Sequence, residues 1–86
     1  MVTKDFIVKN ATGLHARPAT LLAKKAAQFK SEVNIQNGDK AVNAKSLIGI
    51  LSLGAGKGTN LKVTITGIDE ELALTEVIKL LEEITE

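Results

Sequence analysis

The sequence predicts an α+β protein in which four antiparallel strands form one sheet, with helices on one face and water on the other. Two patterns support this fold class. Some short segments alternate apolar and polar residues, as strands with one wet face do. Longer segments repeat apolar residues every three or four positions, as amphipathic helices do. Together they give the order βαββαβα within one predicted domain, residues 1–86.

The first part of the chain is predicted to contain a strand and a long helix. The strand covers Val2 to Val8 and places Phe6 and Val8 on one face. A turn-rich loop at residues 10–13 follows it and precedes a helix from Ala16 to about Phe29. One side of this helix carries Ala19, Leu22, Ala26 and Phe29.

A β-hairpin is predicted next. Val33 and Ile35 alternate with polar residues, which is typical of a half-buried strand. The dipeptide Asn37-Gly38 that follows is a strong short-range signal for a hairpin turn. The returning strand is predicted to contain Val42 and Ala44.

The last part is predicted to contain a short helix, a strand and a final helix. We interpret Ser46 to Leu53 as a helix because serine can cap its start and Gly54 can end it. Alternation from Leu61 to Ile65 predicts the fourth strand. Asp69 is predicted to cap the final helix, whose acidic end at residues 82–86 is expected to fray. Its buried stripe is predicted to contain Ala73, Val77, Leu80 and Ile84.

The composition excludes several classes of function. The net charge of +1 and the two aromatic residues do not suit a nucleic-acid-binding surface, which needs clustered basic groups or exposed rings. With no cysteine and one histidine, neither a disulfide nor a metal site is expected. The opening MVTKDFIVKN lacks the apolar run of a signal peptide, and no segment is long enough to span a bilayer. We therefore expect a cytoplasmic protein that needs no cofactor.

The segment GAGKG, residues 54–58, has the composition of a nucleotide-binding loop but not its spacing. A P-loop would need a glycine at Leu51 and a serine or threonine at Gly58. A dinucleotide-binding fingerprint starting at Gly54 would need a glycine at Thr59. We interpret the segment as a glycine-rich connection between the short helix and the fourth strand.

The stretch GLHARPAT, residues 13–20, contains the only histidine and the only proline of the chain. With His15 as the N-cap of the first helix, Pro18 falls in the first turn, where its missing N–H would have no helical partner. The N–H groups of Ala16 and Arg17 then point out of the positive helix end, which favours an anion. The Arg17 guanidinium adds donors suited to phosphate oxygens. This arrangement suits a phosphoryl group attached to the imidazole.

The spacing alone leaves a second interpretation open, in which His15 is an ordinary surface residue. The wider pattern favours the chemical one. GLHARPAT, together with KSLIGILSLG at residues 45–54, resembles the HPr family. Its members are the histidine-containing phosphocarrier proteins of the bacterial phosphoenolpyruvate-dependent sugar phosphotransferase system. The resemblance extends over the whole chain in length and element order.

The resemblance implies both a fold and a role. The fold is an open-faced β-sandwich with four antiparallel strands and three helices on one side. The role is that of a carrier and not an enzyme: His15 takes a phosphoryl group on Nδ1 from enzyme I and passes it to enzyme IIA components of sugar permeases. Arg17 stabilises the phosphate and the transfer state, beside the phosphate-binding N–H group of Ala16 that the helix start itself predicts. The family's catabolite-repression paralogue has glutamine in place of this histidine, so His15 argues against that variant.

Ser46 also has two interpretations. From the residues alone it is an N-cap. The resemblance implies that it is a regulatory serine, phosphorylated by an HPr kinase/phosphorylase, and that the phosphoserine form binds a catabolite control protein.

The short helix is predicted to have two different apolar faces. Leu47, Ile48 and Leu51 share one face, and Ile50 and Leu53 lie on the other. Either set is apolar enough for the core, but the resemblance implies that the first is exposed and meets partner proteins. We call the whole predicted surface the docking patch, and it contains Ala16, Thr20, Leu21, Lys24, Leu47, Ile48 and Leu51.

Three functions remain open from the sequence. The favoured one is a phosphocarrier of the sugar branch. The second is a phosphocarrier of the nitrogen-related branch, with the same chemistry and other partners. The third is a small regulatory or nucleic-acid-binding module without phosphate chemistry, against which the charge balance and the few aromatic residues argue. We expect a monomer that neither binds nucleic acid nor inserts into a membrane.

Overall fold

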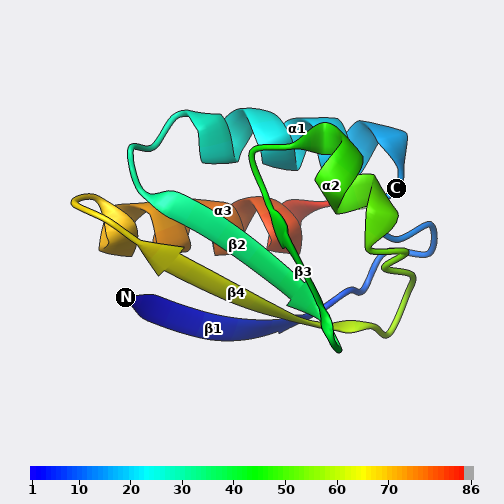
Figure 1. Cartoon of the computed structure of the whole chain (residues 1–86). Coiled ribbons are helices and arrows are strands. Elements are labelled where there is room, and N and C mark those ends of the chain that lie inside the picture. Colours follow the sequence, from blue (N-terminus) through cyan, green and yellow to red (C-terminus); the bar gives the residue numbers. More distant parts are fainter. Residues whose placement is uncertain (85–86) are drawn as a thin grey trace.

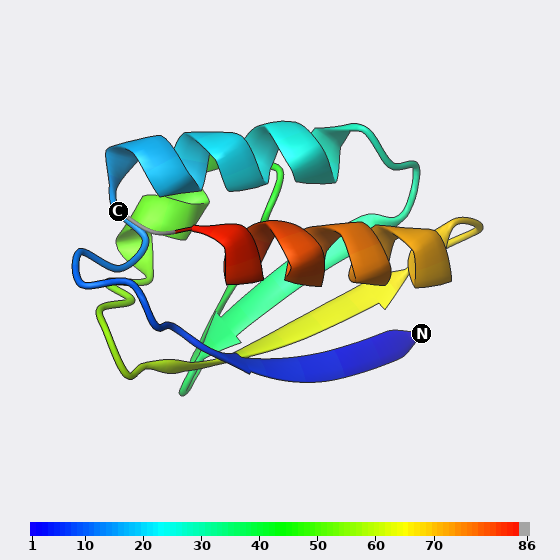
Figure 2. The same cartoon turned by 180° about the vertical axis from the view of Figure 1, so that it is seen from behind.

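Seven elements follow one another in the predicted order βαββαβα (Figure 1). The structure is a computed structural model and describes residues 1–84. The four strands form one antiparallel sheet in the order β1-β4-β2-β3. All three helices cover the same face of this sheet (Figure 2), so the predicted open-faced sandwich is confirmed. The elements are β1 (Val2–Ile7), α1 (Ala16–Ala27), β2 (Glu32–Asn37), β3 (Lys40–Asn43), α2 (Leu47–Ser52), β4 (Asn60–Thr66) and α3 (Glu70–Glu83).

The core lies between the sheet and the helices. Strand β4 is central, and its alternate residues Leu61, Val63 and Ile65 are fully buried, as the alternation predicts. In the register of the sheet, Phe6 is opposite Leu61 and Val33 is opposite Ile65, so apolar side chains of neighbouring strands meet on the helix-covered face. Burying these residues supplies most of the free energy that holds a small domain together.

Both long helices depart from their predicted apolar faces near the C-terminal end. Helix α1 ends at Ala27, so Phe29 lies beyond it and is only half-buried. In α3, Ala73 and Val77 are buried as predicted, but the row continues through Ile78 and Leu81. Leu80 and Ile84 are only partly buried, because the buried row runs through Ala73, Val77 and Leu81, four positions apart, with Ile78 beside it. Helix α3 continues through Glu83, and the rest of the predicted fraying falls on residues 85–86, outside the described residues.

The hairpin turn is one residue further along than predicted. Asn37 pairs with Lys40, so the two turn residues are Gly38 and Asp39. Gly38 has a φ of +60°, and glycine at the first central position is typical of a type II′ turn. The Asn37 side chain donates to the Leu53 carbonyl oxygen at 2.9 Å, which holds it at the strand end and out of the turn.

Asp69 begins α3 as predicted, but its carboxylate does not cap that helix. It accepts hydrogen bonds from the backbone N–H groups of Lys30 at 2.9 Å and Ser31 at 3.0 Å, and from the Ser31 hydroxyl. These bonds hold the pKa of Asp69 below its usual range, with the Ser31 hydroxyl the largest cause. The carboxylate thus joins the α1–β2 connection to the start of α3.

In the part of the chain that the structure describes, no helix has the length and apolar character needed to cross a membrane.

Candidate functional site

The start of α1 has the geometry that GLHARPAT predicts. His15 is the N-cap, with extended backbone angles and no hydrogen bond from its side chain to the helix. The first intrahelical bond runs from the Ala19 N–H to the His15 carbonyl oxygen at 2.8 Å. The N–H groups of Ala16 and Arg17 lie before that bond, at the positive end of the helix. No acidic residue stands in the first turn, so nothing on the helix itself offsets that positive end.

Burial separates the exposed residues of this helix start from the residues that anchor it. His15, Ala16 and Arg17 are exposed, whereas Pro18 and Ala19 are buried. Burial of Pro18 and Ala19 therefore fixes the helix start, while the His15 and Arg17 side chains lie at the surface. Such a start can present one imidazole, backbone donors and one arginine to a phosphoryl group.

The glycine-rich segment lies beside the loop that leads to His15 and does more than connect α2 to β4. The Leu14 N–H donates to the Ala55 carbonyl oxygen at 2.9 Å, and Leu14 is buried. The Gly58 N–H donates to the Val8 carbonyl oxygen at 2.7 Å. The sequence interpretation therefore missed Ala55, which supports the loop, and Asn10, which is buried at the start of it. A local signal for Asn10 was present, since asparagine is typical of tight turns.

Helix α2 has two different faces, as predicted. Ile48 is 80% exposed, and Leu47 and Leu51 are about two-fifths exposed at 39% and 41%. Ile50 is fully buried, and Leu53 is nearly so. Both views place α2 beside the half of α1 that begins at His15 (Figure 1, Figure 2).

Helix α1 contributes the other predicted residues of the docking patch. Leu21 is 44% exposed and Lys24 is exposed. Thr20 is half-buried, and its hydroxyl donates to the Ala16 carbonyl oxygen at 2.7 Å. The structure therefore brings apolar residues of two helices to the surface at the end of the molecule that carries His15.

Ser46 is the N-cap of α2, as predicted. Its hydroxyl oxygen accepts a hydrogen bond from the Gly49 N–H at 3.1 Å, and the side chain is exposed. The helix start is thus closed by its own serine, although the hydroxyl remains at the surface.

Charged residues are separated in the fold, although their numbers nearly balance. No acidic residue lies between Asp5 and Glu32 or between Asp39 and Asp69. These two stretches include α1, α2 and the loops around His15, so the charges they contribute are positive. Helix α3, in contrast, carries most of the described glutamates. The basic residues of the acid-free stretches include Lys9, Arg17, Lys24, Lys45 and Lys57.

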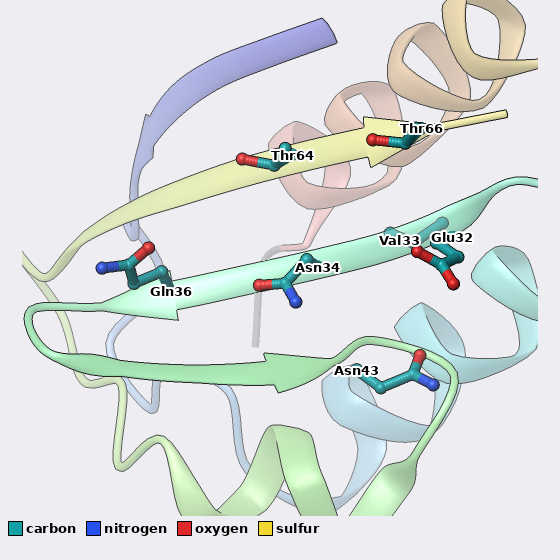
Figure 3. Close-up of a pocket in the computed structure, with 7 residues that line it drawn as sticks. All are labelled: Glu32, Val33, Asn34, Gln36, Asn43, Thr64 and Thr66. Carbon is teal, nitrogen blue, oxygen red and sulfur yellow. The ribbon is translucent and has the colours of Figure 1, made fainter. Parts of the chain in front are cut away.

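A hollow of about 500 Å³ lies on the open face of the sheet, away from the helices (Figure 3). Its side chains are mainly amides and hydroxyls, and it shares no residue with the His15 site. Among residues 1–84, no group of three or more histidine, cysteine or acidic side chains is arranged to hold a metal ion. The hollow is lined by Glu32, Val33, Asn34, Gln36, Asn43, Thr64 and Thr66.

Comparison with known protein families identifies the family of the chain. The family described as "PTS HPr component phosphorylation site", where PTS is the phosphotransferase system, matches residues 2–83. The chain belongs to the HPr family. HPr-C-His from Thermoanaerobacter tengcongensis is 43% identical, with a TM-score of 0.92 over 95% of this chain and 92% of that one. The phosphocarrier HPr of Bacillus anthracis is 39% identical, with a TM-score of 0.87 over 92% and 94%.

A third relative has a different assembly. The catabolite repression protein Crh of Bacillus subtilis is 37% identical, with a TM-score of 0.78 over 100% of this chain and 99% of that one, and is described as a swapped dimer. Membership of the HPr family gives the chain a phosphocarrier role in a phosphotransferase system. An HPr protein carries a phosphoryl group and is not itself a catalytic enzyme.

Proposed function

We propose that His15 is the residue that carries the phosphoryl group. The observation behind this is the start of α1, where the chain's one histidine is exposed beside backbone donors and Arg17. The Nδ1 lone pair attacks the phosphorus held by enzyme I. The new N–P bond forms while the bond to the enzyme I side chain breaks. The reverse exchange, with an enzyme IIA side chain as the nucleophile, hands the group on.

Arg17 and the helix start stabilise the group during transfer. Phosphoryl transfer asks little covalent chemistry of a protein, so positioning and charge stabilisation dominate its rate. The guanidinium supplies paired donors to the phosphate oxygens, and the Ala16 and Arg17 N–H groups add the positive end of the helix dipole. No acidic residue in the first turn opposes the arriving charge.

The docking patch fits partners of one chemistry. Leu21, Leu47, Ile48 and Leu51 offer exposed apolar area, and the segments that carry them contain no acidic residue. A partner surface with an apolar centre and an acidic rim complements this patch. We assign that chemistry to enzyme I and to the enzyme IIA components of sugar permeases, which would meet the same patch in turn, in the cytoplasm.

Ser46 is the regulatory position in this proposal. Its exposed hydroxyl is accessible to an HPr kinase/phosphorylase, and it directly precedes Leu47 and Ile48 of the docking patch. A phosphate there would add about 1.5–2 negative charges beside an apolar contact surface. The added charge would weaken binding to enzyme I, and the phosphate would give a catabolite control protein a new group to bind.

One experiment tests the carrier role directly. The protein is incubated with phosphoenolpyruvate and enzyme I, and the acid-labile phosphate is mapped to a residue. We expect one phosphoryl group on His15, which then moves to an enzyme IIA domain. If only the nitrogen-related enzyme I phosphorylates the protein, and the sugar-branch enzyme I does not, the chain belongs to the nitrogen-related branch. Phosphorylation by neither would return it to the regulatory-module interpretation.

We also propose that the protein is a monomer in solution, although Crh is described as a swapped dimer. In this chain the first strand, β1, is paired with β4 of the same chain over six residues, Val2 to Ile7. Sedimentation equilibrium at micromolar concentrations is expected to give the mass of one chain, 9.1 kDa. A mass of twice that value would contradict the proposal.

A further inference from the structure

Asn10 holds both polar groups of Gly13, three residues further along the loop that leads to His15. Its side-chain amide Nδ2 donates to the Gly13 carbonyl oxygen at 2.8 Å, in a buried hydrogen bond. The backbone carbonyl oxygen of Asn10 accepts a hydrogen bond from the Gly13 N–H at 3.2 Å. Asn10 is 9% exposed, one of the few buried polar residues of the described chain. A buried amide with such a partner is costly to replace, because the carbonyl left behind would lose its donor.

The same loop is held from the other side by the glycine-rich segment. Gly13 has a φ of +66°, and a Cβ there would collide with the Ala55 carbonyl oxygen and lie 2.7 Å from the Gly56 Cα. The Leu14 N–H donates to that Ala55 oxygen at 2.9 Å. The peptide between Gly13 and Leu14 is therefore fixed at both ends, its oxygen by Asn10 and its N–H by Ala55.

This peptide lies one residue before His15. On the other side, the His15 carbonyl oxygen is fixed by the Ala19 N–H at 2.8 Å. The imidazole itself makes no capping hydrogen bond and is exposed. The place of the imidazole therefore depends on the backbone to either side of it, and the part before it depends on Asn10.

We propose that Asn10 is a positioning residue for phosphoryl transfer: its amide fixes the Gly13–Leu14 peptide and so the placement of the His15 imidazole over the start of α1. This inference rests on the proposed function of His15. Without the amide, the Gly13 carbonyl turns toward water, the peptide rotates, and the imidazole samples orientations that do not face the donor. Misplacement of a reacting group by about 1 Å can slow a reaction by about a hundredfold.

The test compares two hydrogen-bond deletions at opposite ends of α1. Asn10→Ala removes the bond to Gly13. Ser31→Ala removes the part-buried hydroxyl bond to Asp69 beyond the other end of α1, a helix of 12 residues that is about 18 Å long at 1.5 Å per residue. Both variants are expected to melt a few degrees below the parent. The saturating rate of His15 phosphorylation by enzyme I is expected to fall about tenfold or more in Asn10→Ala alone.

Two further measurements separate positioning from general loosening. The enzyme I concentration at half-saturation is expected to change less than about twofold in Asn10→Ala, because the docking patch lies on other residues. Hydrogen exchange of the Leu14 N–H is expected to accelerate in Asn10→Ala and not in Ser31→Ala. Asn10→Asp keeps the shape but replaces the N–H donor with a carboxylate that repels the Gly13 oxygen, so it is expected to be at least as slow as the alanine variant and to melt lower. Both variants are assayed at a temperature at which circular dichroism shows that they are folded.

The outcomes distinguish this inference from the function on which it rests. A parent protein that takes no phosphate overturns the carrier role of His15 and the positioning role with it. A parent that is phosphorylated, with Asn10→Ala or Asn10→Asp equally fast at saturation, overturns the positioning role alone. Equal slowing in Ser31→Ala also overturns it, because stability would then explain the rate.

Discussion

Helices α1 and α2 begin in opposite ways. At the start of α2, the Ser46 hydroxyl accepts the Gly49 N–H, so the helix provides its own cap. At the start of α1, His15 provides no side-chain cap, and the first turn contains a proline and no acidic residue. Serine is among the best N-cap residues, whereas histidine is not among the preferred ones.

The comparison indicates what each helix start is for. A closed start gains stability from its cap, typically about 1 kcal/mol. An open start gives up that stabilisation but leaves backbone donors and the positive end of the dipole for an arriving anion. The start of α1 is therefore suited to a transient phosphoryl group, and the start of α2 to holding a short helix in place. Substitutions at the start of α1 should therefore affect phosphoryl transfer, and substitutions at the start of α2 should affect stability and docking.

The largest effect is expected at His15. His15→Ala removes the proposed nucleophile, so phosphorylation from phosphoenolpyruvate through enzyme I should be abolished. The exposed imidazole makes no capping bond, so the free energy of unfolding should change by no more than about 0.5 kcal/mol. Phosphate analysis and thermal melting followed by circular dichroism measure both. Phosphate retained by the alanine variant would place the acceptor elsewhere.

Arg17 should give the next largest effect. Arg17→Lys keeps the positive charge but loses the planar, paired donors of the guanidinium. We expect the saturating rate of phosphorylation to fall about tenfold, which corresponds to about 1.4 kcal/mol of transition-state stabilisation. Rapid-quench kinetics with excess phospho-enzyme I measure this rate. Equal rates in the two proteins would mean that charge alone is sufficient and that the open helix start needs no arginine geometry.

At Ser46, a charge should affect docking more than stability. Ser46→Asp keeps an oxygen cap and adds one negative charge beside Leu47 and Ile48, so binding to enzyme I should weaken several-fold, with melting nearly unchanged. The weakening should shrink at high salt if repulsion between exposed charges causes it. Calorimetric titration at two salt concentrations measures this dependence.

Two controls keep the charge effect separate from the cap. Ser46→Ala removes the cap without adding charge, so it should lose about 1 kcal/mol of stability and keep its affinity for enzyme I. Thr75→Asp adds the same charge on α3, away from the docking patch, and should leave affinity unchanged. An early-melting Ser46→Asp protein, or unchanged affinity, would contradict the proposed separation of roles.

Features set by local pattern could be predicted from the sequence. The alternation of Leu61, Val63 and Ile65 identifies the central strand because side chains on a strand alternate between its two faces. Ser46 and Gly54 mark the ends of α2 because caps act within one turn of the backbone. The exposure of Ile48 and the burial of Ile50 were also predicted, although the resemblance was needed to choose between the two faces.

The remaining features depend on which distant segments meet. Asn10 and Ala55 support the His15 loop together, although they are 45 residues apart in the sequence. The Asp69 carboxylate bonds to residues 30–31 and does not cap its own helix. A local pattern shows that such side chains suit a turn or a cap, but the partner they select is fixed only by tertiary packing.

The smallest effect is expected at the start of α3. In contrast to a change at His15, a change at Asp69 should alter the stability of the fold and leave the rate of phosphoryl transfer unchanged. Hydrogen bonds from the Ser31 hydroxyl and the Lys30 N–H hold the pKa of Asp69 below its usual value of about 4. The folded protein therefore binds fewer protons at this carboxyl than the unfolded chain does in that range. The stabilisation is present above about pH 4 and is lost as pH falls through the lower, folded pKa.

The measurement follows from that sign. Melting temperatures are compared between pH 7 and pH 2 for the parent and Asp69→Asn, which keeps the shape of the side chain and cannot titrate. The parent should lose stability more steeply than the variant below about pH 4. A residual slope is expected in both, because the Gly67 N–H and the Met1 ammonium group also lower the pKa of Glu70. At neutral pH the two proteins should accept phosphate at the same rate. Identical acid slopes would show that the Asp69 carboxylate contributes nothing as an ion, and a slower Asp69→Asn at neutral pH would show that the two ends of the molecule are coupled.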